Sequence, residues 1–377
     1  MPNATICLNM IVKNESHVLR RCLDSVLPFI DSWVICDTGS TDGTQDLVRQ
    51  HLKDIPGELH QCAWRDFGYN RSEALQLAKG KADYTLIIDA DEVLLVGPNF
   101  RMPTLVADEY QIRHEAKDSG TSFYLSQLVR SALPWRYVGV LHEAIVCDAT
   151  HTTATLEGLT TKGLFDGARN ADPQKKYLAD AAVLEAAWRN EPDNARTVFY
   201  LAQSYRDAGE LAKSLEVYER RASMSGWDEE AWYSLYQVAV LRERLAQEPS
   251  LIVAAYLHAY QHRPTRAEPL CALARYHRER KQFALAHLFS SAAMQIVRPA
   301  DILFLDDSVY DWRIIDEYAV SAYWLGRFGD ALKAVDRLLS ENKLPSSELA
   351  RVEKNKAFCV QQLAVQAEKA CNEDASQ

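Results

Sequence analysis

The second half of the chain repeats itself, and this repeat limits the folds open to it more than any other feature. Small and aromatic side chains recur there with a period of about 34 residues. Such a period indicates stacked helix pairs, because one pair alone cannot bury its apolar face. Two stretches, residues 246–250 and 300–311, interrupt the period. The sequence therefore predicts an all-α array with two insertions.

The individual repeats resemble tetratricopeptide repeats. Copies of the template start near Ala195, Glu229, Ala267 and Trp312. Small residues stand where paired helices must approach closely, and aromatic residues stand where gaps must be filled. A further helical pattern precedes the first copy, so we expect a tetratricopeptide-like domain over residues 173–365.

The first half of the chain alternates apolar runs with amphipathic helical patterns. Residues 5–12 and 33–36 are near-continuous apolar runs, as expected of buried parallel strands, and each precedes a helical pattern. This order predicts a right-handed, parallel α/β unit. Residues 109–113 and 123–130 alternate at period two, which predicts added antiparallel strands. Residues 151–172 contain several Thr and Gly residues and are expected to form a loop or hinge.

A further apolar run, residues 86–88, ends abruptly in Asp89, Asp91 and Glu92. Ligands of α/β proteins bind outside the carboxyl ends of the strands, so carboxylates at this point indicate a site. Asp89 and Asp91 face the same side in extended geometry, where they could share a hard divalent cation. The alternative is an acidic turn that caps the next element.

Two more polar segments lie where a ligand crevice is expected. The turn at residues 37–44 is dense in Asp, Gly, Ser and Thr and follows the second strand. The alternative role, capping of the next helix, is compatible with ligand binding. Arg65 and Arg71 flank the start of another helix, where the macrodipole disfavours a cation. Their place suggests an external anion such as a diphosphate, the alternative being pairing with Asp66 or Glu73.

Four segments together resemble family 2 glycosyltransferases with the GT-A fold. They are NMIVKNE at residues 9–15, DTGSTDGT at 37–44, NRSEALQLA at 70–78 and DADE at 89–92, in the family's order and at its typical spacing. The set is most similar to bacterial lipopolysaccharide-core glucosyltransferases and peptide glycosyltransferases. The resemblance implies a nucleotide-diphosphate sugar as donor, a UDP-sugar before others, a Mn²⁺ or Mg²⁺ cofactor, and transfer with inversion.

The resemblance also implies roles for single residues. Asp37 would meet the base or ribose of the nucleotide, Asp89 would lie near the ribose and the metal, and Asp91 would bind the metal. The segment from Arg65 to Arg71 would flank the nucleotide pocket. The implied donor-binding residues are Asn9, Lys13, Glu15, Asp37, Arg65, Asn70, Arg71, Asp89 and Ala90.

Residues 133–143 follow at the place where the acceptor-side half of a GT-A domain would complete the site. Glu143 is the candidate general base, because inverting displacement needs a carboxylate that takes the proton of the acceptor. His142 is a candidate metal ligand beside Asp89 and Asp91. As strand neighbours the two would point to opposite faces, so only one of them would face the metal.

Composition excludes several classes of protein. The formal net charge of −10 argues against a nonspecific binder of nucleic acid or anionic membranes. No apolar run reaches the roughly 18 residues of a transmembrane helix, and the N-terminus lacks the basic region of a signal peptide. The eight cysteines are scattered without a Cys-x-x-Cys motif, as expected of reduced cysteines in a cytoplasmic protein.

These observations predict an α/β GT-A domain with a Rossmann-like mixed sheet at residues 1–165, followed by the tetratricopeptide-like domain at residues 173–365. We expect a bacterial, metal-dependent, inverting hexosyltransferase whose helical domain binds the acceptor or forms a homodimer. The acceptor is left open among peptide, protein, lipid-linked or other glycan, and small molecule. The alternative is a non-catalytic repeat scaffold with a relic nucleotide-sugar-binding domain, and the intact set of acidic site residues argues against it.

Overall fold

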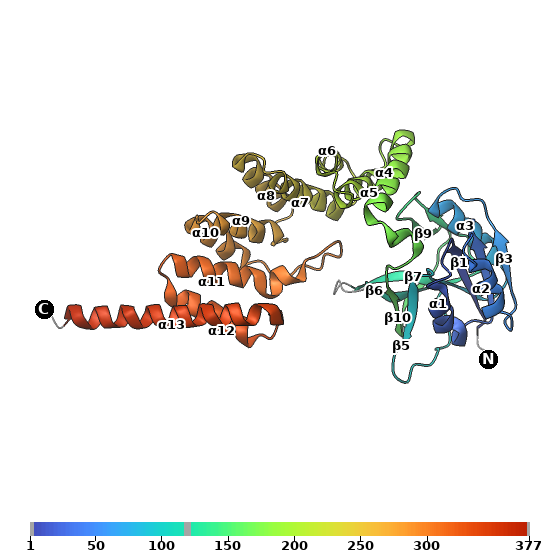
Figure 1. Cartoon of the computed structure of the whole chain (residues 1–377), viewed down its shortest axis with the longest axis horizontal. Coiled ribbons are helices and arrows are strands. Elements are labelled where there is room, and N and C mark those ends of the chain that lie inside the picture. Colours follow the sequence, from blue (N-terminus) through green and yellow to red (C-terminus); the bar gives the residue numbers. More distant parts are fainter. Residues whose placement is uncertain (1–3, 117–121, 375–377) are drawn as a thin grey trace. The chain divides into compact units, whose positions relative to one another are not determined.

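The computed structural model describes residues 4–116 and 122–374 (Figure 1). The chain divides into two compact units, Met1–Pro192 with Asp207–Gly209 and Asp193–Arg206 with Glu210–Gln377. The first unit is α/β and the second is all-α, so the predicted fold class is confirmed. The predicted limits at residues 165 and 173 stay predictions.

One mixed sheet of eight strands forms the centre of the α/β unit. Its strands are β1 (Ile6–Val12), β2 (Ser32–Asp37), β3 (Gly57–Gln61), β4 (Tyr84–Ile87), β5 (Glu92–Val96), β6 (Glu109–Ala116), β7 (Ser122–Arg130) and β10 (Thr153–Gly163). They lie in the order β3-β2-β1-β4-β7-β6-β10-β5. The first four in this order run parallel, and β7 then joins β4 antiparallel. The βαβ strands and the antiparallel pair of β6 and β7 expected from the sequence therefore share one sheet, in which β10 pairs parallel with β6.

Helices cover both faces of the parallel half of the sheet. Leu8 of β1 lies in one apolar cluster with residues of α1 (Leu19–Val26) and α2 (Thr44–His51). Its neighbour Cys7 points to the other face and packs with α3 (Phe67–Ala78). Because β1 is buried on both sides, its sequence is a continuous apolar run rather than an alternating one.

A small hairpin packs on the start of α3. It consists of β8 (Trp135–Val138) and β9 (Ala144–Cys147), which pair antiparallel. A Cβ at Gly68 would lie 2.2 Å from the carbonyl oxygen of Gly139. Only glycine therefore allows the turn between β8 and β9 to approach the first turn of α3 so closely.

The loop or hinge predicted over residues 151–172 is wrong over half of its length. Residues 153–163 form β10, which pairs with both β6 and β5. Its register with β6 shifts between Thr155 and Thr160. This β-bulge breaks the period-two pattern that would have indicated a strand. After β10 the chain leads into α4 (Pro173–Asn190).

The second unit is an array of consecutive helices, as the repeat predicts (Figure 1). The helices are α5 (Ala195–Asp207), α6 (Leu211–Ala222), α7 (Asp228–Arg244), α8 (Pro249–His262), α9 (Glu268–Glu279), α10 (Phe283–Ala293), α11 (Ile314–Trp324), α12 (Phe328–Ser340) and α13 (Ser346–Asp374). Small and aromatic side chains such as Ala239, Tyr256 and Ala293 form its core. The tetratricopeptide-like helix pairs thus pack through the positions that carry the repeat.

The insertion between α10 and α11 is fixed to the array by a buried ion pair. Arg266 is fully buried, pairs with Glu268 at 2.7 Å, and lies 3.8 Å from the ring centre of Trp232. It also donates hydrogen bonds to the carbonyl oxygens of residues 303 and 304. Glu229 of α7 accepts hydrogen bonds from the backbone N–H groups of residues 302 and 303, at 3.0 and 2.8 Å. The insertion is therefore an ordered part of this unit.

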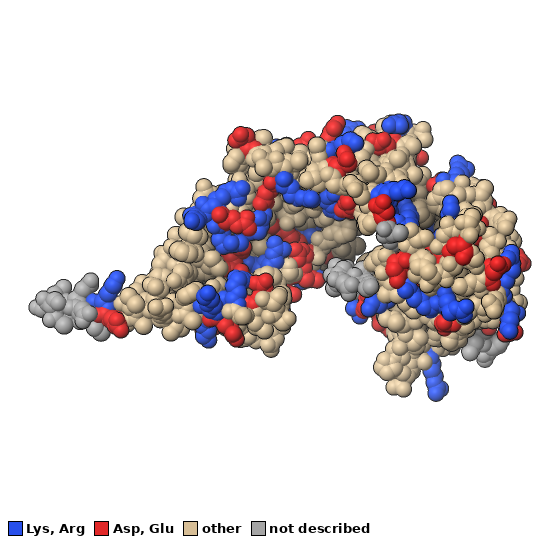
Figure 2. All heavy atoms as spheres, viewed as in Figure 1, with Lys and Arg blue, Asp and Glu red and all other residues tan. Residues whose placement is uncertain are grey.

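Charged side chains of both signs are intermingled on the face in view in Figure 2, so neither sign forms a continuous field there. Within the described residues, no helix has the length and apolar character needed to cross a membrane.

Candidate active site

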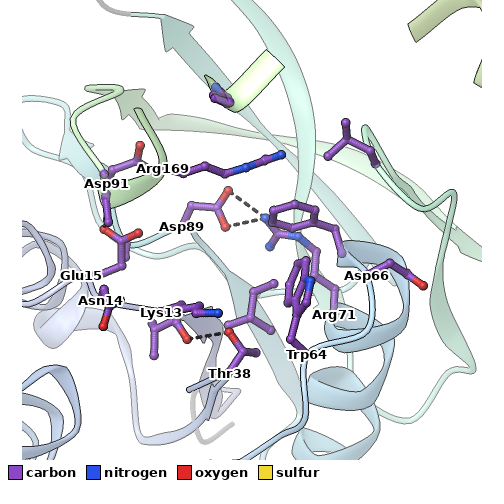
Figure 3. Close-up of a pocket in the computed structure, with 18 of the residues that line it drawn as sticks. Lys13, Asn14, Glu15, Thr38, Trp64, Asp66, Arg71, Asp89, Asp91 and Arg169 are labelled. Atoms are coloured by element: carbon purple, nitrogen blue, oxygen red, sulfur yellow. Dashed lines mark hydrogen bonds and ion pairs between the residues drawn. The ribbon is translucent and has the colours of Figure 1, made fainter. Parts of the chain in front are cut away.

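A cavity of about 650 Å³ opens at the carboxyl ends of the parallel strands (Figure 3). Val12 ends β1, Thr38 follows β2, and Asp89 follows β4. This is the edge at which open α/β sheets bind their ligands. The charged residues that line it are Lys13, Glu15, Arg65, Asp66, Arg71, Asp89, Asp91, Glu92, Arg169, Lys176 and Asp180.

Two carboxylates lie side by side in the cavity, those of Glu15 and Asp91 (Figure 3). A Cβ at Gly167 would lie 3.2 Å from an oxygen of each. Burial, together with the charge of Asp91, raises the pKa of Glu15 to about 7. Burial and the charge of Asp89 raise the pKa of Asp91. The site thus holds desolvated, mutually repelling negative charge that a cation would stabilise.

Glu92 supports this acidic segment from the buried side, a role that the sequence did not indicate. Its Oε2 accepts a hydrogen bond from the backbone N–H of Asp89 at 3.2 Å and another from Gln127 at 3.3 Å. His114 Nδ1 lies 3.4 Å from its Oε1. Burial, with the charge of Asp89, raises the pKa of Glu92 to about 8. Glu92 therefore fixes the backbone that carries the cavity carboxylates.

Arg71 of α3 forms ion pairs with two carboxylates. Its Nη2 lies 2.6 and 2.8 Å from the carboxylate oxygens of Asp89, and its Nε lies 2.6 Å from Oε1 of Glu143. The guanidinium also lies 5.7 Å from the ring centre of Tyr137. Burial alone would lower the pKa of Arg71, but the charges of Asp89 and Glu143 outweigh it and raise that pKa. The guanidinium of Arg71 thus joins Asp89 to Glu143, the predicted general base.

His142 and Glu143 lie in the turn between β8 and β9 and not in a strand. His142 has a left-handed backbone, with a φ of 50°. The expectation that the two side chains alternate across a strand therefore does not apply. Glu143 is 11% exposed and meets the cavity through Arg71, since neither Glu143 nor His142 is among its lining residues. The base and ligand roles of these residues stay predictions.

Asp37 organises the turn after β2. Its Oδ1 accepts hydrogen bonds from the backbone N–H groups of Gly39 and Ser40, at 3.0 and 2.9 Å, and from Gln45 Nε2 at 3.0 Å. Its Oδ2 is buried and has no hydrogen-bond partner among the described residues. Asp37 lies behind the cavity wall, next to the lining residue Thr38.

Two residues predicted to bind the donor form hydrogen bonds with backbone groups. Asn9 donates hydrogen bonds to the carbonyl oxygens of Val34 and Ala74, at 3.2 and 2.9 Å, which joins β1 to β2 and α3. Asn70 is fully buried and accepts from the N–H of Arg65 at 2.9 Å. Neither they nor Asp37 line the cavity, whereas the other six predicted donor residues, Lys13, Glu15, Arg65, Arg71, Asp89 and Ala90, do.

The donor atoms of the cavity fit a hard cation. Among the described residues, no group of three or more His, Cys, Asp or Glu side chains is arranged as a metal site. Mg²⁺ and similar ions, however, are commonly held by one or two carboxylates together with substrate phosphates and water. The paired oxygens of Glu15 and Asp91 match that pattern, so a cation that arrives with a phosphate ligand is compatible with the cavity.

Several cavity residues come from a segment with no site motif. Arg169, Lys176 and Asp180 follow β10, as does Phe165, whose exposed ring also lines the cavity. The sequence offered only a weak signal for them, namely two cations shortly after a Gly-rich stretch. They reach the cavity through long-range packing of β10 and α4.

Comparison with known proteins matches the two halves of the chain separately. Residues 7–97 match the model of glycosyl transferase family 2. The glycosyltransferase SunS of the SPbeta prophage of Bacillus subtilis is 32% identical over 90 residues, which is 24% of this chain and 20% of that protein. A TPR repeat-containing protein of Synechococcus elongatus is 31% identical over 150 residues, 38% of this chain and 36% of that protein. The matches thus span only a fifth to about a third of these relatives.

Among solved structures, TarS of S. aureus is 12% identical with a TM-score of 0.34, over 66% of this chain and 54% of that chain. A likeness of this size carries no conclusion about function.

Proposed function

We propose that the protein is an inverting glycosyltransferase, because residues 7–97 match the model of glycosyl transferase family 2 and tetratricopeptide-like helices follow. It would move a hexose from a nucleotide-diphosphate sugar, a UDP-sugar before others, to a nucleophilic acceptor. The observation that carries the proposal is the cavity at the strand ends, in which Arg71 links Asp89 to Glu143. The sugar of the donor and the nucleophile of the acceptor would meet beside these ion pairs.

The nucleotide would enter beside the ends of β1 and β2. Lys13 and Thr38 line this side of the cavity, and the buried Oδ2 of Asp37 lies behind it without a partner among the described residues. A buried oxygen without a hydrogen-bond partner costs free energy of folding. A small shift of the turn would let this oxygen accept a hydrogen bond from an N–H group of the base or an O–H group of the ribose. Asn9 and Asn70 would contribute by holding the surrounding backbone rather than by touching the donor.

Mn²⁺ or Mg²⁺ would be held by Asp91 with Glu15 or Asp89, and His142 stays a predicted ligand. A bound divalent cation would stabilise negative charge on the leaving nucleoside diphosphate. Glu92 keeps the acidic segment in place through the backbone N–H of Asp89. Removal of Asp91 should therefore remove the metal requirement together with the activity.

Glu143 would act as general base on the acceptor. The bond from the anomeric carbon to the diphosphate oxygen breaks, and its electron pair stays on the diphosphate. The acceptor atom bonds to the opposite face of the anomeric carbon, and its proton passes to Glu143. Arg71 pairs with Oε1 of Glu143, and Oε2 would take the proton of the acceptor. The helical unit would bind a peptide, protein or glycan acceptor or form a homodimer.

The test is donor turnover. The full chain is incubated with a panel of nucleotide sugars, with Mn²⁺ or with EDTA, and released nucleoside diphosphate is measured. We expect metal-dependent release from at least one sugar and a loss of about 10²- to 10⁴-fold in Glu143→Gln, the usual share of a general base. Nucleotide binding without any turnover across donors and acceptors would favour a non-catalytic scaffold. No nucleotide binding at all would refute the proposal.

A further inference from the structure

One wall of the cavity is cationic and lies outside the segment matched by the family. The lining residues of α4 are Lys176, Ala179, Asp180 and Val183. Their spacing of three and four residues places them on one face of the helix. Arg169 precedes α4 and extends across the cavity above Asp89 (Figure 3). The wall therefore brings two cations to the side of the cavity that holds the acidic residues.

Arg169 is held in a fixed position. Its guanidinium forms an ion pair with Asp180, whose side chain is 4% exposed, and lies 4.6 Å from the ring centre of Phe67. Among the described residues its side chain makes hydrogen bonds to Asp180 alone. Arg169 itself is 41% exposed, so a guanidinium with five N–H donors presents several of them to the cavity. A buried carboxylate and an aromatic ring thus orient a cation that remains accessible.

The backbone before Arg169 sets its distance from the acidic residues. The N–H of Ala168 donates to Oε2 of Glu15 at 3.3 Å, and the N–H of Leu164 donates to the carbonyl oxygen of Asp91 at 3.1 Å. A Cβ at Gly167 would lie 3.2 Å from a carboxylate oxygen of Asp91 and of Glu15, so a side chain there would press on both. Arg169 is therefore anchored immediately beside the carboxylates that would hold a cation.

The environment disfavours the charged forms of both basic residues. Burial lowers the pKa of Arg169. Burial and the neighbouring charge of Arg169 lower the pKa of Lys176. A bound anion would offset both effects. A diphosphate carries enough oxygens to contact both basic residues and also a cation that Glu15 and Asp91 would hold.

We propose that Arg169, together with Lys176, binds the diphosphate of the nucleotide donor and stabilises the charge that it gains as leaving group. This inference rests on the proposed function. As the bond between the anomeric carbon and the diphosphate breaks, the electron pair stays on the terminal phosphate oxygen. Arg169 stays protonated and donates hydrogen bonds to that phosphate throughout. Asp180 is a positioning residue that holds the guanidinium.

The experiment compares nucleotides that differ by one phosphate. Binding of UDP and UMP, and of GDP and GMP, is measured by calorimetry on the full chain with Mn²⁺ and with EDTA. The test variant is Arg169→Gln with Asp180→Asn, which removes both charges and leaves no buried carboxylate without its cation. The control is Arg136→Gln with Asp148→Asn, the same change at an exposed pair 3.0 Å apart.

We expect the test variant to bind the diphosphate about 10- to 100-fold more weakly, the usual effect of losing charge-assisted hydrogen bonds. Affinity for the monophosphate should fall by less than about threefold, and the control should bind both as the wild type does. Arg169→Lys should bind the diphosphate with intermediate affinity, because it keeps the charge and loses the planar fork.

Equal losses for diphosphate and monophosphate, or no loss for either, would overturn the inference. A loss for UDP-glucose without a loss for UDP would also overturn it, because the contact would then be to the sugar. If the wild type binds no nucleotide, the proposed function falls and the inference falls with it. If the wild type binds and the variant does not separate the two nucleotides, only the inference falls.

Discussion

Replacing Arg71 with glutamine should destabilise the α/β unit strongly, because Arg71 forms ion pairs with two carboxylates. Its Nη2 lies 2.6 Å from Asp89, and its Nε lies 2.6 Å from Glu143. Asp89 is 41% exposed and would keep contact with water, whereas Glu143 is 11% exposed and would become a buried charge without its cation. Removal of one partner of a buried pair costs about 3–5 kcal/mol. Since only one of the two carboxylates is buried, we expect about 3 kcal/mol.

The assay is thermal unfolding of the full chain combined with hydrogen exchange of α3. A loss of 1 kcal/mol lowers the Tm of a unit of this size by about 2–4 °C, so Arg71→Gln should lower it by roughly 6–12 °C. Faster exchange in residues 67–78 would assign the loss to the α/β unit. Arg136→Gln serves as the matched control, because its pair with Asp148 is exposed and contributes no more than about 1 kcal/mol.

A double-mutant cycle tests whether the loss of stability comes from the buried charge of Glu143. If the cost comes from leaving Glu143 charged and buried, then Arg71→Gln with Glu143→Gln should be more stable than Arg71→Gln alone. Two losses that simply add would refute the account. Arg71 would then contribute through its packing on Tyr137 rather than through its charge.

Three further changes test the cavity. Asp91→Ala should abolish Mn²⁺-dependent release of nucleoside diphosphate with an unchanged hydrogen-exchange pattern, and undiminished release would remove its metal role. Asp37→Ala should weaken nucleotide binding in calorimetry more than it lowers turnover at saturating donor, and it should cost about 1–2 kcal/mol in urea unfolding because the turn loses its acceptor. Glu15 has a folded pKa raised from 4.5 to about 7, so the stability it contributes is present below about pH 4.5 and is lost as pH rises through about 7. The wild type should therefore lose urea stability between about pH 4.5 and about pH 7 relative to Glu15→Gln, and parallel pH curves would contradict the burial of its charge.

The parts of the site that could be predicted are those encoded by local sequence. The apolar runs of β1, β2 and β4 are buried on both faces, and their carboxyl ends meet at one sheet edge. That rule alone brings Glu15, Asp89 and Asp91 into one cavity.

The rest depends on contacts that local sequence does not contain. An asparagine within a strand can face a ligand or satisfy a backbone carbonyl, and the position of α3 is what lets Asn9 donate to the carbonyl oxygen of Ala74. The bulge in β10 hides a strand, and that strand carries Arg169 to the cavity. The pairing of Arg71 with Glu143 likewise requires the close approach that Gly68 permits.

The buried pair of Arg266 and Glu268 changes how the helical unit should unfold. In an ideal repeat array each repeat interacts only with its neighbours, so the ends fray independently of the middle. Here Arg266 holds the carbonyl groups of residues 303 and 304, while Glu229 of α7 holds the amides just before them. The insertion therefore couples repeats that are not adjacent. The stretch from α7 to α11 should behave as one cooperative block, with α13 free to open before it.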